Sequence, residues 1–173
     1  VNTQASVLSE ADFTNVTNIE TIDIGSDLAY TVVVGNTTVA SGQTVNITNT
    51  GYAATSTKVA TINASAVTTA GGAVSITLGG VGAHNTVLGN GNDTYTSTST
   101  AVDDVTATAG NNTITTGAGA DIIVLGAGND KVSGEAGADD FKVETAYLTT
   151  DDTLIGGAGV DEIILTNAAT VVD

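Results

Sequence analysis

The second half of the chain alternates glycine turns with short apolar segments at a fixed interval. Glycines recur every nine residues, at Gly110, Gly119, Gly128 and Gly137. An Asn or Asp follows each glycine by two residues, and an apolar residue follows that by two more: Ile114, Ile123, Val132 and Phe141. Alternation along a strand puts the apolar side chain on one face and its neighbours on the other. The pattern predicts tandem units, each made of a tight turn and a strand of about three residues.

The same pattern extends in both directions. Toward the N-terminus it includes a unit at Asp103 and, one residue out of register, residues 91–95. Toward the C-terminus, a four-residue insertion within residues 143–150 precedes a unit at Asp152 and then residues 157–163. We therefore expect about eight units in all.

Strands this short are not stable alone, so we expect the units to stack. If each unit turns the chain by half a circuit, two units make a coil of about 18 residues, and parallel strands of successive coils lie about 4.8 Å apart. Glycine suits such turns because they need positive φ and close backbone approach. The expected fold is an all-β parallel β-roll or β-solenoid over residues 79–165. Its core would be one column of side chains: Tyr95, Val105, Ile114, Ile123, Val132, Phe141, Leu154 and Ile163.

The regions outside the repeats are less regular. Residues 1–78 contain short β-alternating pieces separated by Gly and Asn turn signals, which predict a β-rich domain or an irregular β-solenoid. Residues 79–88 have the glycines, but His84 or Asn85 stands where the repeat has Asp, so we expect an uncharged lead-in coil. His84 is the single histidine, and we expect it in a turn or at the surface. Residues 166–173 are expected to form a C-terminal tail.

Charge narrows the possible partners. The net charge is -16, and fourteen of the nineteen acidic residues lie from Asp93 onward. This charge repels nucleic acids and anionic membranes and favours cations. The chain has no cysteine, which suits an exported protein without disulfides, although a cytosolic protein can also lack cysteine. No apolar stretch approaches the roughly 20 residues of a membrane helix, and no signal peptide opens the chain. Because it begins with Val1, we expect a processed form or an excerpt of a longer polypeptide.

Stacking at this period would align like charges. Asp103, Asp121 and Asp139 would share one edge, and Asn112 and Asp130 the other. At about 5 Å and an effective dielectric of about 20, two carboxylates repel by roughly 3 kcal/mol, so several pairs rival the stability of a domain. A cation must offset this repulsion. Ca²⁺ fits best because it accepts about six to eight carboxylate and carbonyl oxygens in flexible geometry, whereas Mg²⁺ demands octahedral order and Zn²⁺ prefers Cys and His.

Residues 117–133, GAGADIIVLGAGNDKVS, resemble two tandem nonapeptides of the repeats-in-toxin (RTX) family. The resemblance covers roughly residues 80–165. It implies a β-roll that binds several Ca²⁺ ions between successive turns, type I secretion, and folding outside the cell, where calcium is abundant.

The resemblance also implies the calcium ligands. Side-chain ligands would come from Asp121, Asp130 and Asp139, with further candidates at Asp93, Asp103, Asn112, Asp152 and Asp161. Backbone carbonyls would come from the turns around Gly117, Gly119, Gly126, Gly128, Gly134 and Gly137. Simple turn chemistry is the alternative for Asp103 and Asp152. Sites should be weaker or absent where the repeat is broken, at Ala101, Asn112, Glu135, Ala136 and Thr150.

A second resemblance concerns the biological role. Residues 12–22, DFTNVTNIETI, are similar to a segment common in bacterial surface-layer and adhesin proteins that carry these repeats. It implies a secreted, calcium-dependent structural protein of the bacterial cell surface that self-associates into an array, with cell-surface polysaccharide as a further candidate partner. Two alternatives remain. The chain could be the calcium-binding export and folding module of a secreted enzyme, or part of an adhesin for carbohydrate or ice, which an exposed flat threonine array in residues 1–78 would favour.

The residues do not suggest an enzyme. The chain offers no nucleophile with an adjacent base and no phosphate-binding loop. Adjacent acidic pairs, such as Asp103 with Asp104, should point to opposite faces of a strand and cannot converge on a substrate. We therefore expect a non-catalytic role.

Overall fold

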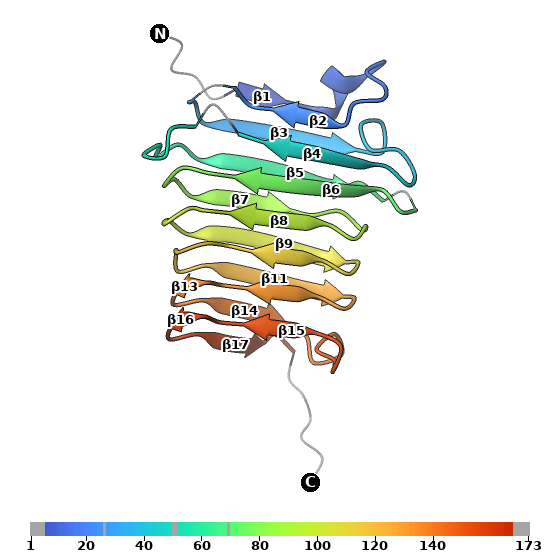
Figure 1. The fold of residues 1–173 in the computed structure, drawn as a ribbon. Helices are drawn as coiled ribbons and strands as arrows, with labels where there is room; N and C mark the ends of the chain where they lie inside the picture. Colours follow the sequence, from blue (N-terminus) through green and yellow to red (C-terminus); the bar gives the residue numbers. More distant parts are fainter. Residues whose placement is uncertain (1–5, 26, 50–51, 69, 168–173) are drawn as a thin grey trace.

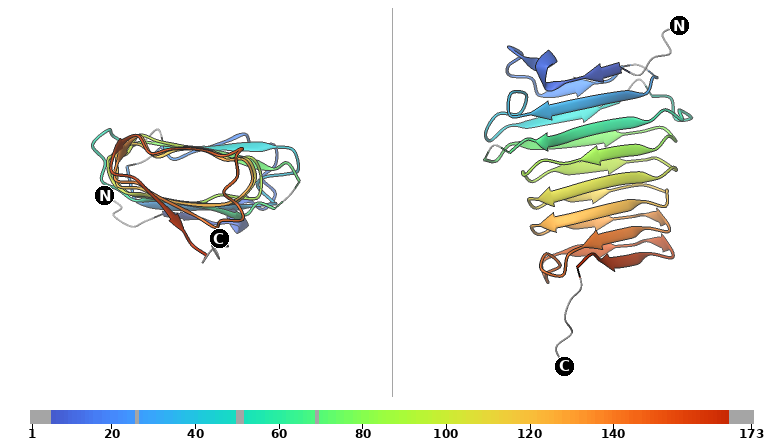
Figure 2. Two further views of the ribbon diagram at one scale, coloured as in Figure 1. Left: turned by 90° about the horizontal axis from the view of Figure 1, so that it is seen from below. Right: turned by 180° about the vertical axis from the view of Figure 1, so that it is seen from behind.

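The computed structural model describes residues 6–25, 27–49, 52–68 and 70–167, which form a β-solenoid. Figure 1 shows the coils stacked in chain order from the N-terminal to the C-terminal end. Seen along the stack, the coils form a flattened ring with one sheet on each long side (Figure 2). The expected all-β parallel fold is confirmed, and every strand pairing in the described residues is parallel.

Two long sheets and one short pair account for the strands. Sheet A contains β1 (Ser6–Leu8), β3 (Tyr30–Gly35), β5 (Ala60–Ala66), β7 (His84–Val87), β9 (Asp103–Ala109), β11 (Ile122–Ala127), β14 (Asp140–Val143) and β17 (Glu162–Leu165). Sheet B contains β2 (Thr21–Asp23), β4 (Thr44–Thr48), β6 (Ala73–Leu78), β8 (Thr94–Ser97), β10 (Thr113–Thr115), β12 (Lys131–Ser133) and β15 (Thr153–Ile155). Strands β13 (Ala136–Gly137) and β16 (Ala158–Gly159) pair separately, and a short 3₁₀ helix, η1 (Glu10–Phe13), lies near the N-terminal end.

The number of residues between paired positions on neighbouring strands gives the length of each coil. Ile122 pairs with Asp140, the residue two nonapeptides further along, which confirms that two nonapeptides make one coil. Thr94 pairs with Thr113, one position beyond two nonapeptides, so the extra residue expected in the unit at 91–95 is present. Lys131 pairs with Thr153 instead of Thr149, which confirms the four-residue insertion.

The first coils are longer, but they belong to the same stack. Tyr30 pairs with Ala60, and Ala60 pairs with His84, so each of these coils exceeds the length of two nonapeptides. The described strands of residues 1–78 therefore belong to the same β-solenoid as the later coils. Both sheets continue across residue 79 through the β5–β7 and β6–β8 pairings. The coils on both sides of residue 79 share one core. A boundary there therefore stays a prediction about which coils bind calcium.

The core is a column of inward-facing side chains, as expected. Six of its eight predicted members are fully buried: Tyr95, Val105, Ile114, Ile123, Val132 and Phe141. Leu154 is partly buried, whereas Ile163 is 51% exposed. Ile163 lies on β17, the last strand of sheet A, so no described coil stacks beneath it. The column continues into the first coils with Val32, Ile47, Ile62 and Ile76.

Candidate metal centre at the two edges of the roll

Two columns of polar residues follow the narrow edges of the ring, where turns lead into strands. The A-edge comprises the residues that begin or directly precede strands of sheet A: His84, Asp103, Asp121, Asp139 and Asp161. The B-edge comprises the residues that directly precede strands of sheet B: Asp93, Asn112, Asp130 and Asp152. Parallel pairing places successive members one coil apart. All eight predicted side-chain ligands therefore lie on these two edges.

Aspartates of the A-edge link successive coils through one carboxylate oxygen. Oδ1 of Asp121 accepts a hydrogen bond of 2.8 Å from the backbone N–H of Asp103. Oδ1 of Asp139 accepts one of 2.9 Å from Asp121, and Oδ1 of Asp161 accepts one of 3.1 Å from Asp139. Each carboxylate thus reaches toward the preceding coil. In Asp139 and Asp161 the second oxygen then lies against a glycine of the turn.

The second oxygen of three A-edge carboxylates has no donor. Oδ2 of Asp103, Asp121 and Asp139 is buried and makes no hydrogen bond of normal geometry, although the Thr116 side chain lies near enough to Asp121 to lower its pKa. Burying an anionic oxygen without a donor is costly, and native structures rarely tolerate it. These oxygens fit a role as cation ligands, because a bound cation would supply the missing favourable interaction.

Glycines bring turn backbone against these carboxylates. A β-carbon at Gly134 would lie 2.2 Å from Oδ2 of Asp139, and one at Gly156 would lie 2.2 Å from Oδ2 of Asp161. Only glycine leaves this space free. The predicted turn glycines also pack against carbonyl oxygens of the preceding coil: a β-carbon would lie 2.7 Å or less from such an oxygen at Gly117, Gly119, Gly126, Gly128 and Gly137.

Carboxylate and carbonyl oxygens are therefore the available donors, and this hard-oxygen set suits Ca²⁺. Among the described residues, no three acidic, histidine or cysteine side chains converge on one point. Carbonyl oxygens would have to supply most ligands of any ion. Asp121 and Asp139, with the turns at Gly117–Gly119 and Gly134–Gly137, would hold calcium, whose charge would offset the buried negative charge.

The B-edge differs from the A-edge, because the chain itself supplies donors to its carboxylates. Oδ1 of Asp93 accepts a hydrogen bond of 2.8 Å from Val74 N–H, and its Oδ2 accepts one of 2.9 Å from Gly89 N–H. Oδ2 of Asp152 accepts one of 2.7 Å from Thr149 N–H. Predicted ligands are thus not equivalent, and those with donor-free oxygens lie on the A-edge.

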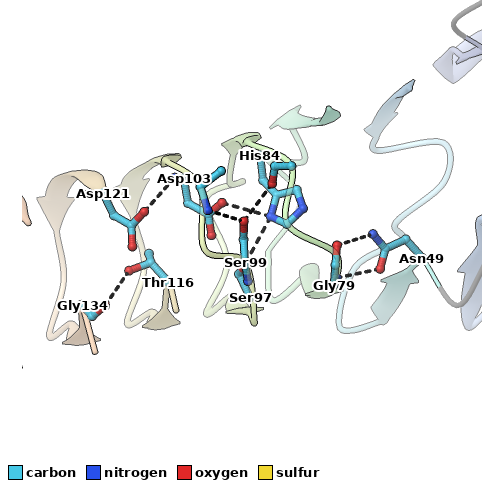
Figure 3. A network of polar contacts seen from close by, with 11 residues as sticks. Asn49, Gly79, His84, Ser97, Ser99, Asp103, Thr116, Asp121 and Gly134 are labelled. Carbon is cyan, nitrogen blue, oxygen red and sulfur yellow. Dashed lines mark hydrogen bonds and ion pairs between the residues drawn. The ribbon is translucent and has the colours of Figure 1, made fainter. Parts of the chain in front are cut away.

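The expectation for His84 was wrong. Its side chain is fully buried and begins β7, because His84 occupies the position of the aspartates in the A-edge column. Its Nδ1 lies 3.0 Å from Oδ1 of Asp103 and 3.2 Å from Oγ of Ser97 (Figure 3). The signal was present in the sequence, since His84 follows Gly80 and Gly82 at the spacing of the repeat aspartates.

Burial also alters the acidity of the edge aspartates. Desolvation raises the pKa of Asp121 to about 6, although backbone N–H donation from Asp103 opposes the shift. Desolvation likewise raises the pKa values of Asp93, Asp130 and Asp139. Without a cation, the folded protein therefore binds protons at these positions more readily than the unfolded chain does.

We expect the metal-free protein to be more stable at pH 5 than at pH 7.5. Because the folded pKa of Asp121 is about 6 and its ordinary value is 3.8, the folded state retains a proton that the unfolded state releases. The free energy of unfolding should therefore fall as pH rises through this window, by on the order of 1 kcal/mol from Asp121 alone. Urea unfolding in the presence of a chelator, at pH 5 and at pH 7.5, measures this change in the free energy of unfolding. With saturating calcium the free energy of unfolding should instead rise with pH, because calcium and protons compete for the same carboxylates. Equal urea midpoints at both pH values without metal would contradict the shift.

Comparison with protein families agrees with this geometry. Residues 97–132, 106–141 and 149–166 match a family model. It describes the RTX calcium-binding nonapeptide repeat, in four copies. The matched RTX segment spans the coils that carry Asp103 to Asp161 and covers less than half of the chain. It supports the RTX resemblance and a calcium-binding structural role for these coils.

Two further observations complete the comparison. No curated protein and no solved structure matches the chain. Within the described residues, no helix has the length and apolar character needed to cross a membrane.

Proposed function

We propose that the chain is a calcium-dependent structural protein of the bacterial cell surface, similar to surface-layer proteins, and that it is secreted before it folds. Calcium would order the RTX coils, and the ordered roll would then associate with further copies. The observation that carries the proposal is the buried, donor-free oxygens of Asp121 and Asp139 beside glycine turns. Without calcium these oxygens oppose folding, so calcium concentration would control whether the coils form.

Association is supported by the C-terminal end of the stack. Four large apolar side chains are exposed there, with exposed fractions of 53% for Ile155, 85% for Val160, 51% for Ile163 and 48% for Leu165. Among the described residues, β15 and β17 are the last members of their sheets, and no described strand pairs with the outer edge of either. Such an end suits contact with another copy. It exists only when the preceding coils are folded, which would couple assembly to calcium.

A threonine row on sheet B favours the adhesin alternative as a second candidate. Thr48, Thr77, Thr96 and Thr115 pair successively across β4, β6, β8 and β10, and none is buried. Two members of the row, Thr48 and Thr77, lie within residues 1–78, where the adhesin alternative places an exposed threonine array, and the other two lie beyond it. A regular hydroxyl array of this kind suits a carbohydrate or ice surface.

Adding calcium to chelated protein should increase the β-sheet circular dichroism signal and light scattering together. The β-signal should rise because calcium removes the repulsion on the A-edge, and scattering should rise because the apolar coil end forms. Magnesium at the same concentration is the control, since its rigid octahedral demand suits these sites poorly.

The two readouts separate the candidates. A β-signal that ignores calcium would overturn the calcium-dependent role. A calcium-specific gain in β-signal without scattering would remove the self-assembling role and favour a monomeric adhesin or an export module.

A further inference from the structure

Both edge columns contain one residue that is not an aspartate. Asn112 stands inside the B-edge, and His84 begins the A-edge. Both side chains are almost completely buried. Each contacts carbonyl or carboxylate oxygens of the kind that a bound cation would contact.

Asn112 shows this replacement atom by atom. Its Oδ1 accepts a hydrogen bond of 3.0 Å from Asp93 N–H, the same inter-coil contact that Oδ1 of Asp121 makes on the A-edge. Its Nδ2 occupies the position of the second carboxylate oxygen and lies near three oxygens. These are Ala109 O at 3.2 Å, Gly110 O at 3.1 Å and Asp130 Oδ1 at 3.0 Å.

The difference between an amide and a carboxylate decides what can bind here. An aspartate at residue 112 would turn an acceptor oxygen toward two carbonyls and a carboxylate. Four oxygens around one point repel unless a cation lies between them. The Asn112 amide instead donates its hydrogens to these groups. One chain-supplied N–H₂ group therefore does at the B-edge what calcium would do.

His84 performs a similar replacement at the start of the A-edge. Its Nδ1 contacts Oδ1 of Asp103, so one oxygen of this carboxylate meets an imidazole from the preceding coil, while Oδ2 has no donor. Ser99 Oγ donates a hydrogen bond of 2.8 Å to the carbonyl of Gly82, which lies in the turn before His84 (Figure 3). Side chains thus contact both kinds of oxygen that calcium would bind.

Charged groups also disappear from the columns beyond His84 on the A-edge and beyond Asp93 on the B-edge, and Asp93 itself accepts N–H donors from Val74 and Gly89. Ala60 pairs with His84 and so continues the A-edge column, while Val74 and Val45 continue the B-edge column. Their side chains are buried and apolar. The coils from β3 to β8 therefore contain no unsatisfied carboxylate of the Asp121 type among their described residues.

We propose that His84 and Asn112 are built-in substitutes for calcium that divide the roll into a calcium-independent N-terminal part and a calcium-dependent C-terminal part. The N-terminal coils would fold first and present β9 and β10 as a template on which calcium orders the coils from Asp121 to Leu165. This inference rests on the proposed calcium-dependent role of the RTX coils.

Asn112→Asp tests the proposal directly. The variant should bind one more calcium ion per chain than the wild type, as counted by native mass spectrometry. In chelator, hydrogen exchange of β8 and β10 should accelerate, and calcium should restore their protection. Asn129→Asp is the matched control, because it adds the same charge to the same class of turn at a side chain that is not buried. It should leave both the ion count and the exchange of β8 and β10 unchanged.

His84→Asp tests the A-edge in the same way. Exchange at β7 and β9 should accelerate in chelator and slow again in calcium. In the wild type without calcium, strands β11 to β17 should exchange markedly faster than strands β3 to β8. Uniform exchange along the whole wild-type chain in chelator would overturn the division into two parts.

Failure of this inference differs from failure of the proposed function. Wild-type protein that binds no calcium would overturn the calcium-dependent role itself. Wild-type protein that binds calcium, with Asn112→Asp binding the same number of ions, would overturn only the substitution by Asn112.

Discussion

Replacing Gly137 with alanine should prevent calcium from ordering the C-terminal coils. The new β-carbon would lie 1.6 Å from the carbonyl oxygen of Gly119, so the two adjacent coils could no longer stack. A clash with backbone is not relieved by side-chain rotation, and we expect a loss of at least ~3 kcal/mol of unfolding free energy. Calcium titration monitored by circular dichroism measures the effect.

Gly25→Ala is the matched control for this prediction. Apart from its chain neighbours, no described residue has a heavy atom within 4 Å of a β-carbon built at Gly25, and its φ is not positive. This variant should follow the wild-type calcium titration. If Gly137→Ala also did so, the turns would not pack as tightly as the structure shows.

Asp139→Ala should weaken the calcium response at least tenfold. Asp139 is fully buried, its Oδ1 accepts the N–H of Asp121, and its Oδ2 has no donor. Alanine removes both the inter-coil hydrogen bond and a calcium ligand. A charged hydrogen bond contributes about 1.5–3 kcal/mol, which corresponds to one or two factors of ten in the calcium midpoint.

Asp140→Ala provides the comparison, because it removes an equal charge from the neighbouring residue. Asp140 is only partly buried, and its carboxylate lies 3.9 Å from Nζ of Lys142, an arrangement of small energetic value. We expect less than a twofold change in the calcium midpoint. Equal effects of the two variants would show that net charge, and not the A-edge geometry, controls folding.

Periodicity explains why the fold of the RTX coils was predictable. One glycine, one aspartate and one apolar residue in each nonapeptide fix the turn, the edge and the core, and each coil needs only its neighbours. The positions of Asp121, Asp130 and Asp139 follow from this period alone. The extra residue at 91–95 and the insertion within 143–150 change coil length without changing which strands pair.

Other features depend on contacts that no period reveals. Asp93 and Asp121 hold the same position in their units of the sequence. In the structure, both oxygens of Asp93 accept N–H donors from Val74 and Gly89, whereas Oδ2 of Asp121 has no donor and is a candidate calcium ligand. The burial of His84 was missed because a lone histidine suggests no partner until register places it opposite Asp103. The first coils lack a fixed period, since the coil from β3 to β5 is longer than the coil from β5 to β7.

The loop that lengthens the last coil is a suitable place to insert a foreign peptide. Its insertion leaves β12 paired with β15 and β14 paired with β17, so the added residues protrude without disturbing the ladder. Tyr147 and Leu148 lie in this protrusion and are partly exposed. A peptide grafted between them would be displayed beside the coils that calcium orders. Removing calcium would unfold these coils, so the peptide would no longer be held in a fixed position. The protein could thus serve as a display scaffold whose presentation follows calcium concentration.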